Sequence, residues 1–412
     1  MVYVYNRITA FLKLIGPGLL FAAAAIGVSH LVQSTRAGAL YGLFFIPIIL
    51  ITNLLKWPFF EAGPRYAQIT GKSLIHAYTK DNRWGWPLVA GITILSMFIV
   101  QATVTMVTAG LFQFLIPLPE WVIIAGLLII SSLLLTSGAY KLLDKVIRYV
   151  VLILAISTVV AVLIGLQLPI PTFDIQAFSW TNAVDIAFLV ALLGWMPAPL
   201  DISIWHSTWT LSAKSAGEKK AYNPWDFRIG YWGTTGFAIL FLLLGALFLF
   251  HSDGEIPGSA VAFSTHLMNV YQSALGSAYW LVVIAACACM FSTTLTVLDA
   301  YPRVCVFLKA NQNKESEEET LPMRYYRPLV YITAVMAFVI TTWFSGQMIA
   351  LVQLATTIAF LSAPVIAWLN IRAMQQLPKS DQPGRFSQWM SYGGLLFLIL
   401  FSLYYIYWVW LM

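Results

Sequence analysis

The residues of this sequence that could do chemistry lie inside long apolar stretches, where a polar side chain is costly. The stretch ALLGWMPAPLDISIWHS, residues 191–207, contains Pro197, Pro199 and the carboxylate of Asp201. Each proline removes a backbone hydrogen bond and clashes with the preceding turn, so we expect the helix to unwind there. Asp201 then lies in the first turn of the second half-helix, where it could bind a cation or cap the free N–H groups.

A second stretch, GPGLLFAAAAIGVSHLVQSTRAG at 16–38, places Gly27, Ser29 and His30 in the middle of an apolar run. Transition metals bind carboxylate, imidazole and soft sulfur, so a metal site would use Asp201, His30 and Met196. The alternative for this stretch is a face of small residues that packs closely against another helix.

A third stretch carries three consecutive hydroxyl side chains, Ser292, Thr293 and Thr294. Hard, uncharged oxygen ligands of this kind suit Na⁺, which broken transporter helices bind together with free backbone carbonyls. The alternative is that these hydroxyls bond back to their own helix, as Ser and Thr commonly do.

The composition identifies the class of protein that holds these residues. Of 412 residues, 60% are hydrophobic and only 10% are charged, against about 25% charged in an ordinary soluble domain. This excludes a soluble enzyme, a nucleic-acid-binding protein and a disordered scaffold. It predicts a multi-pass protein of a lipid bilayer, with no obligate protein partner. Cys287, Cys289 and Cys305 lie in or beside one apolar segment, and we interpret them as packing residues, not as a disulfide framework or zinc site.

Eleven segments are apolar over the length of about 20 residues that crosses a membrane as a helix. They are 13–35, 39–59, 88–116, 120–138, 146–167, 183–208, 229–250, 270–303, 328–345, 347–371 and 389–411. The two suspected breaks fall in the first and the sixth segment. Two repeats of five helices, 1–167 and 183–371, would therefore place the breaks in equivalent positions.

Because five is an odd number, the second repeat would be inverted relative to the first. The expected fold is all-α and forms one transmembrane domain over 1–412, with discontinuous helices 1 and 6 and an eleventh helix at 389–411. This arrangement is typical of secondary transporters whose site lies between two broken helices.

The distribution of Lys and Arg predicts the orientation, since cytoplasmic loops are rich in both. With the N-terminus in the cytoplasm, Lys56 and the basic loops fall on the inner side, and of the 23 basic residues only Arg36 lies in an outer half. We therefore expect a cytoplasmic N-terminus and an external C-terminus in the cell membrane, which is the inner membrane in a bacterium. The net charge of +6 follows from this bias and indicates no nucleic-acid partner.

A series of motifs runs along the chain in a fixed order. They are GPG at 16–18, TRAGALYG at 35–42, RYAQITGKSL at 65–74, SGAYKLLDKVIR at 137–148, Met196-Pro197, His206-Ser207, FSTTLT at 291–296 and Gln353. In order and spacing they resemble the NRAMP family of metal-ion transporters, part of the amino-acid–polyamine–cation superfamily. The resemblance covers nearly the whole chain and implies a LeuT-like fold and secondary active transport by alternating access.

The chain departs from this family where the metal would bind. The family's D-P-G-N motif in the first helix is replaced by Gly27, Val28, Ser29 and His30. In the sixth helix, Ala198 stands where the family has a histidine. The metal-ligating aspartate and asparagine are therefore absent, and a metal substrate is not expected.

Two half-helix N-termini would point into such a site, and helix N-termini attract anions. His30, if protonated, and Arg36 would add to the attraction. We therefore expect uptake of a small anion such as bicarbonate, coupled to Na⁺, with no other cofactor. The substrate site would comprise Gly27, Val28, Ser29, His30, Met196, Pro197, Ala198, Pro199, Asp201 and Gln353. The fold implied by the resemblance places the coupling Na⁺ between helices 1 and 8, at Ala25, Gly27, Ser292, Thr293 and Thr294.

The competing hypothesis is a divalent-cation transporter for Mn²⁺ or Mg²⁺. Its ligands would be Asp201, His30 and Met196, and it could be coupled to H⁺ through Asp299 and His206. A receptor or channel is disfavoured, because broken helices in inverted repeats imply alternating access. An enzyme is disfavoured because the sequence has no paired carboxylates and no H-E-x-x-H motif.

Overall fold

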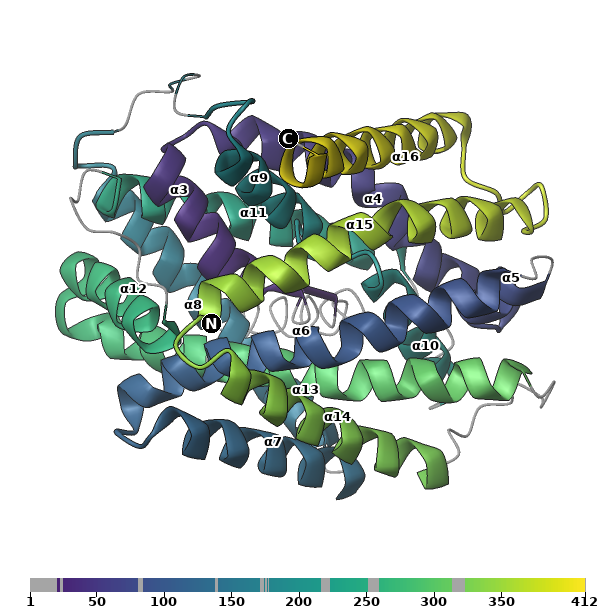
Figure 1. Ribbon diagram of the computed structural model, residues 1–412, viewed down its shortest axis with the longest axis horizontal. Helices are drawn as coiled ribbons and strands as arrows, with labels where there is room; N and C mark the ends of the chain where they lie inside the picture. The colour runs from purple at the N-terminus through teal and green to yellow at the C-terminus, as the bar shows by residue number, and fades with distance from the viewer. Residues whose placement is uncertain are drawn as a thin grey trace, which may run out of the picture.

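The computed structural model describes residues 21–22, 25–80, 84–137, 140–170, 174, 176, 178–215, 223–250, 259–312 and 323–411. In this part of the chain every regular element is a helix, as the sequence predicts (Figure 1). Eight helices of the described residues are long and apolar enough to cross a membrane. The elements are η1 (Ser29–Ser34), α3 (Thr35–Tyr41), α4 (Phe45–Thr70), α5 (Leu74–Lys80), α6 (Gly85–Leu115), α7 (Glu120–Ser137), α8 (Tyr140–Gly165), α9 (Ala183–Gly194), α10 (Ile202–Ser215), α11 (Pro224–Phe248), α12 (Ala260–Leu275), η3 (Gly276–Ala278), α13 (Tyr279–Gln312), α14 (Met323–Trp343), α15 (Met348–Gln375), α16 (Arg385–Ile406) and η4 (Tyr407–Leu411).

Most predicted spans coincide with one of these helices. The span 120–138 corresponds to α7, 347–371 corresponds to α15, and 183–208 is divided between α9 and α10. The start of the first predicted span, the GPG motif and part of the motif at 137–148 lie outside the described residues.

The boundaries predicted for the second span, 39–59, are wrong. The first helix continues through α3 to Tyr41, Gly42 turns the chain with a φ of +55°, and α4 then runs to Thr70. Pro58 and Pro64 lie inside α4 and do not end it. Prolines are tolerated in membrane helices because neighbouring helices satisfy the freed backbone groups. Lys56 is consequently in the middle of α4 and not at its predicted cytoplasmic end.

The eighth predicted span, 270–303, joins parts of two helices. The helix α12 ends at Leu275, the short turn η3 follows, and α13 begins at Tyr279. The turn depends on Gly276, whose φ of +55° is accessible to glycine without a Cβ clash. Continuous apolar composition across this turn conceals it in the sequence.

The long helices enclose the two broken segments. The pair α6 and α13 pack along each other, α10 packs on α4, and α15 packs on α9. The helices α7 and α14 lie along one long side of the molecule, and α16 lies along the opposite side (Figure 1). Residues 25–28 before η1 are buried, and so are the residues between α9 and α10 except Pro199, which is half-buried.

The helices α3 and α11 touch through their backbones. A Cβ atom on Gly245 would lie 2.0 Å from the carbonyl oxygen of Thr35, and one on Gly38 would lie 1.9 Å from that of Leu242. Small residues permit such close approach, and the resulting van der Waals contact drives helix association in membranes.

We expect Gly245→Ala to destabilise the protein by about 3 kcal/mol, because the added methyl group overpacks a backbone contact. Thermal unfolding in detergent measures this as a lower melting temperature. Gly236→Ala is the matched control, since it lies on the same helix and an added Cβ there meets nothing within 4 Å. Equal melting temperatures for the two variants would contradict the close contact.

Candidate ion-binding site

The sixth predicted span is broken as its prolines suggest. The helix α9 ends at Gly194, α10 begins at Ile202, and the connecting residues include Pro197 and Pro199. The peptide bond between Met196 and Pro197 is cis. The backbone in this segment therefore leaves carbonyl groups without helical partners.

The first predicted span is interrupted at Ile26 and Gly27. The helix resumes after them, with the backbone N–H of Leu31 donating to the Gly27 carbonyl at 3.0 Å. The Ile26 carbonyl accepts hydrogen bonds from two side chains of α13, Thr293 Oγ1 and Cys289 Sγ, each at 3.3 Å. The break thus carries an oxygen that faces α13 instead of its own helix.

Glycine is required at the first break for lack of space. A Cβ atom on Gly27 would lie 2.9 Å from Thr293 Cγ2 and 3.2 Å from Thr293 Oγ1. An aspartate, the family's residue at this position, would not fit against α13 in this arrangement. The interpretation of Cys289 as a packing residue is incomplete, because its thiol also donates to the Ile26 carbonyl.

A cavity of about 30 Å³ lies between the two breaks. It has room for about two water molecules or a small ion. Its walls come from both breaks and from α6 and α13. The lining residues are Ala25, Gly27, Val28, Ser29, Val100, Val104, Trp195, Pro199, Ile202, Trp205, Thr293 and Val297. None of them carries a charge.

The cavity wall contains an indole donor with nothing to bond. Trp195 is 3% exposed, and its Nε1 group finds no hydrogen-bond partner within the described part of the chain. Buried donors are normally satisfied, so an unsatisfied one invites explanation by a missing ligand or water. Sequence reasoning missed Trp195, which reads as an ordinary apolar residue of the span.

The structure brings six of the predicted site residues to this cavity. They are Ala25, Gly27, Val28, Ser29, Pro199 and Thr293. It does not bring the other predicted residues to the cavity wall. Met196, Pro197 and Ala198 are buried in the break between α9 and α10, and Gln353 lies on α15.

His30 is turned away from the cavity. Its Nε2 atom lies 3.0 Å from the Thr234 carbonyl of α11, and its Nδ1 atom lies 2.7 Å from Ser29 Oγ. Since a carbonyl only accepts, Nε2 carries the ring proton, and the single proton of the Ser29 hydroxyl is shared between Nδ1 and the Ala25 carbonyl, which lies 3.0 Å from Ser29 Oγ. Both ring nitrogens are occupied, so neither is open to a metal ion.

Asp201 precedes α10 and is 8% exposed. Its Oδ2 atom accepts a hydrogen bond from the Tyr301 hydroxyl at 2.8 Å, whereas Oδ1 has no partner among the described residues. A helix-capping carboxylate would accept from a backbone N–H of the first turn. The Ile202 N–H in the first turn of α10 also interacts with this carboxylate, so Asp201 contacts both α10 and, through Tyr301, α13.

The three predicted hydroxyls of α13 point in different directions. Thr293 Oγ1 and Thr294 Oγ1 both donate to carbonyls of their own helix, Cys289 at 3.1 Å and Met290 at 3.0 Å, which is the alternative considered for these hydroxyls. Thr293 Oγ1 also lies 3.3 Å from the Ile26 carbonyl at the first break, whereas Thr294 Oγ1 lies 2.8 Å from Thr108 Oγ1 of α6. The hydroxyl of Ser292 is buried and finds no partner in the described structure. Only Thr293 therefore reaches the carbonyl that the break exposes.

Lys56, predicted near the inner end of the second span, lies instead in the middle of α4. Its side chain is completely buried, and Nζ donates to three carbonyl oxygens at the end of α9. This contact could not be predicted from the sequence, because Lys56 lies near a span end in the predicted boundaries. The corrected bounds of α4 place it beside the second break.

Arg36, the predicted outer basic residue, also lies outside the cavity wall. Its guanidinium group stacks over the Phe188 ring of α9 at 5.3 Å, and Nη1 donates to Gln33 Oε1 at 3.4 Å. It therefore contacts α9, the first half of the sixth span.

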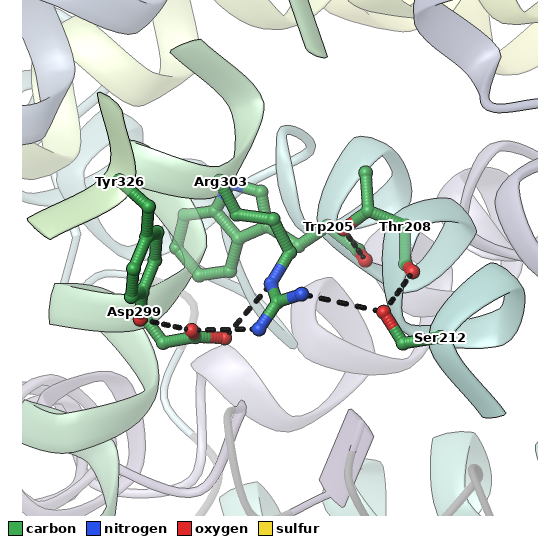
Figure 2. Close-up of polar contacts among 6 residues, drawn as sticks. All are labelled: Trp205, Thr208, Ser212, Asp299, Arg303 and Tyr326. Atoms are coloured by element: carbon green, nitrogen blue, oxygen red, sulfur yellow. Dashed lines mark hydrogen bonds and ion pairs between the residues drawn. The ribbon is translucent and has the colours of Figure 1, made fainter. Parts of the chain in front are cut away.

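A polar network joins the far end of α10 to α13 and α14 (Figure 2). Asp299 Oδ1 accepts from the Tyr326 hydroxyl at 2.5 Å and from Arg303 Nη2 at 2.8 Å. Arg303 Nη1 also donates to Ser212 Oγ of α10 at 3.3 Å. Any movement of α10 relative to α13 must break this last contact.

A family model described as natural resistance-associated macrophage protein-like, or Nramp, matches residues 18–408. The chain belongs to the Nramp family. An uncharacterized protein of Pasteurella multocida (strain Pm70) is 33% identical to it over 402 residues, which are 95% of this chain and 91% of that relative. The Nramp family and its structural neighbours are membrane transporters, so this chain is a multi-pass transporter and not an enzyme.

Solved structures share the fold at low sequence identity. A variant of the Eremococcus coleocola manganese transporter is similar with a TM-score of 0.66 at 15% sequence identity. The matched region covers 94% of the present protein and 85% of the transporter variant. MhsT in complex with L-phenylalanine is similar with a TM-score of 0.64 at 15% sequence identity. The matched region covers 96% of the present protein and 98% of MhsT. These similarities show the LeuT-like fold.

Proposed function

We propose that this protein is a secondary transporter that takes up a small anion such as bicarbonate together with Na⁺. The observation that carries the proposal is the uncharged cavity between the two breaks, which is lined by Trp195, a residue whose Nε1 group has no partner among the described residues. An N–H group can donate to an anion and cannot ligate a metal. The cavity's small volume suits an ion of a few atoms.

The side chains near the breaks do not suit a transition metal. Among the described residues, no three His, Cys, Asp or Glu side chains form a group that could hold a metal ion. Of the three ligands considered from the sequence, His30 is bonded through both nitrogens and Met196 is absent from the cavity wall. A protein selects such metals by ligand type and geometry, and neither is provided here.

The first break supports Na⁺ as the coupling ion. The Ile26 carbonyl and the Thr293 hydroxyl lie 3.3 Å apart and are both uncharged oxygen ligands. Unwound carbonyls of this kind coordinate Na⁺ in transporters with broken helices. An inward Na⁺ gradient across the cell membrane would drive the proposed uptake.

One observation favours the alternative, a transporter of Mn²⁺ or Mg²⁺. Asp201 Oδ1 is buried and has no partner within the described residues, so this carboxylate could serve as a ligand. Mg²⁺ keeps several of its waters and needs few direct protein ligands. A solved structural neighbour is a manganese transporter. Asp299 and His206 would then be the candidates for H⁺ coupling.

Uptake into proteoliposomes separates the two candidates. We expect bicarbonate uptake that requires an inward Na⁺ gradient, no uptake of Mn²⁺ or Mg²⁺, and less than a threefold change in Asp201→Asn, because a carboxylate does not attract an anion. Asp174→Asn, at an exposed position, is the control. Metal uptake that Asp201→Asn abolishes, without any response to Na⁺ or bicarbonate, would overturn the anion proposal.

A further inference from the structure

We propose that Lys56 is a built-in cation of the central site, which occupies the carbonyl cluster at the end of α9 and makes the site prefer anions. This inference deepens the proposed function and rests on the central cavity being the substrate site. Lys56 Nζ donates to the carbonyls of Leu193 at 2.6 Å, Gly194 at 3.3 Å and Met196 at 3.1 Å. No part of the side chain is exposed.

The three carbonyls form the kind of cluster that binds a mobile cation. The last carbonyls of a helix have no N–H partner, and the C-terminal end of a helix carries partial negative charge. In broken transporter helices such carbonyls coordinate the transported or coupling ion. Here a tethered ammonium group fills the cluster, so a free cation cannot use it.

The charge of Lys56 has no acidic counterpart. Within the part of the chain that the structure describes, the ion pairs are Arg65 with Glu61 and Arg303 with Asp299, and no carboxylate oxygen lies within 4.0 Å of Lys56 Nζ. The acid at the other end of the same break, Asp201, bonds to Tyr301. The ammonium group is therefore held by carbonyl dipoles and not by an opposite charge. Its unit positive charge is not cancelled and still attracts anions and repels cations nearby.

A purely structural role would not need this charge. A neutral amide could donate to the same carbonyls, and burying an ammonium group without an ion-pair partner is costly. The charge itself acts on whatever occupies the cavity, whose wall includes Trp195 and Pro199 of the same break. At a separation on the order of 10 Å and an effective dielectric constant of about 20, one unit charge alters the affinity for a monovalent anion about tenfold. A divalent cation would be repelled twice as strongly in free energy.

The first test uses ion-dependent thermal stability of the purified full-length protein in choline chloride. Lys56→Ala vacates the carbonyl cluster, and K⁺ is a probe of about the size of an ammonium ion. We expect K⁺ to raise the melting temperature of Lys56→Ala by several degrees and to leave the wild type unchanged. Lys379→Gln, at an exposed lysine, is the control and should behave as the wild type. A lack of K⁺ stabilisation in folded Lys56→Ala would overturn the proposal.

The second test measures bicarbonate uptake by Lys56→Gln, which keeps a donor for the carbonyls and removes the charge. We expect the KM for bicarbonate to rise about tenfold with an unchanged maximal rate, and an unchanged KM would overturn the proposal. If Lys56→Ala does not fold, the KM of Lys56→Gln for bicarbonate alone tests the proposed role of the Lys56 charge. If the wild type takes up no bicarbonate, the proposed substrate fails, and the K⁺ measurement still decides the role of Lys56.

Discussion

Thr293→Val is expected to weaken the binding of the coupling Na⁺ while leaving the fold intact. The substitution replaces the hydroxyl that faces the Ile26 carbonyl by a methyl group and keeps the contact with Gly27. It removes one of the two uncharged oxygens offered to Na⁺ at the first break, and a carbonyl alone is a poor site. We expect at least a tenfold rise in the Na⁺ concentration for half-maximal bicarbonate uptake, about 1.4 kcal/mol of binding free energy.

Thr296→Val provides the control for this prediction. Thr296 lies on the same helix, and its hydroxyl bonds to the Ser292 carbonyl of that helix at 2.8 Å. The isosteric change there should leave the Na⁺ response as in the wild type. If the two variants lose Na⁺ dependence equally, the effect comes from α13 as a whole, and the proposed Na⁺ position is wrong.

The helix breaks could be predicted from the sequence because their causes are local. Pro197 and Pro199 interrupt hydrogen bonding wherever they occur, and the interval between Gly194 and Ile202 is irregular in the structure. The course of α4 could not be predicted in the same way. Pro64 stands near its end without terminating the helix, because neighbouring helices decide whether a proline is tolerated.

The cavity was only partly predictable. Ser29 and Thr293 drew attention because polar side chains are rare in apolar spans, and both line it. The unpartnered N–H of Trp195 could not be predicted, because whether a donor has a hydrogen-bond partner depends on residues that are distant in the sequence. For His30 the sequence was misleading. An imidazole side chain suggests a metal ligand, but the His30 ring contacts the Thr234 carbonyl of α11.

The electrostatics expected from the helix ends also needed the structure. The sequence predicts two half-helix N-termini that attract an anion. It does not predict which groups neutralise the partial negative charge at the C-terminal ends of the preceding half-helices. The first break directs its Ile26 carbonyl to the side chains of Cys289 and Thr293. The second directs its carbonyls to Lys56. Because donors from α4 and α13 cover the negative ends, the positive ends face the cavity with less opposition.

Trp195→Phe is expected to weaken substrate binding without weakening the fold. The indole N–H in the cavity wall lacks a partner among the described residues, and the proposed anion would accept its hydrogen bond. A hydrogen bond to a charged group contributes about 1.5–3 kcal/mol, so the KM for bicarbonate should rise roughly tenfold to a hundredfold. The melting temperature without substrate should be unchanged or higher, because the variant no longer buries an unsatisfied donor.

Trp57→Phe distinguishes a ligand contact from a general effect of losing a buried indole. The Nε1 group of Trp57 also lacks a described partner, but its ring packs against Trp232, 6.3 Å away, and is absent from the cavity wall. Both variants remove the same atoms and should have similar stability, and only Trp195→Phe should raise the KM. If Trp195→Phe transports bicarbonate with the KM of the wild type, the donor does not touch the substrate. The proposed contact between the Trp195 N–H and an anion would then be wrong.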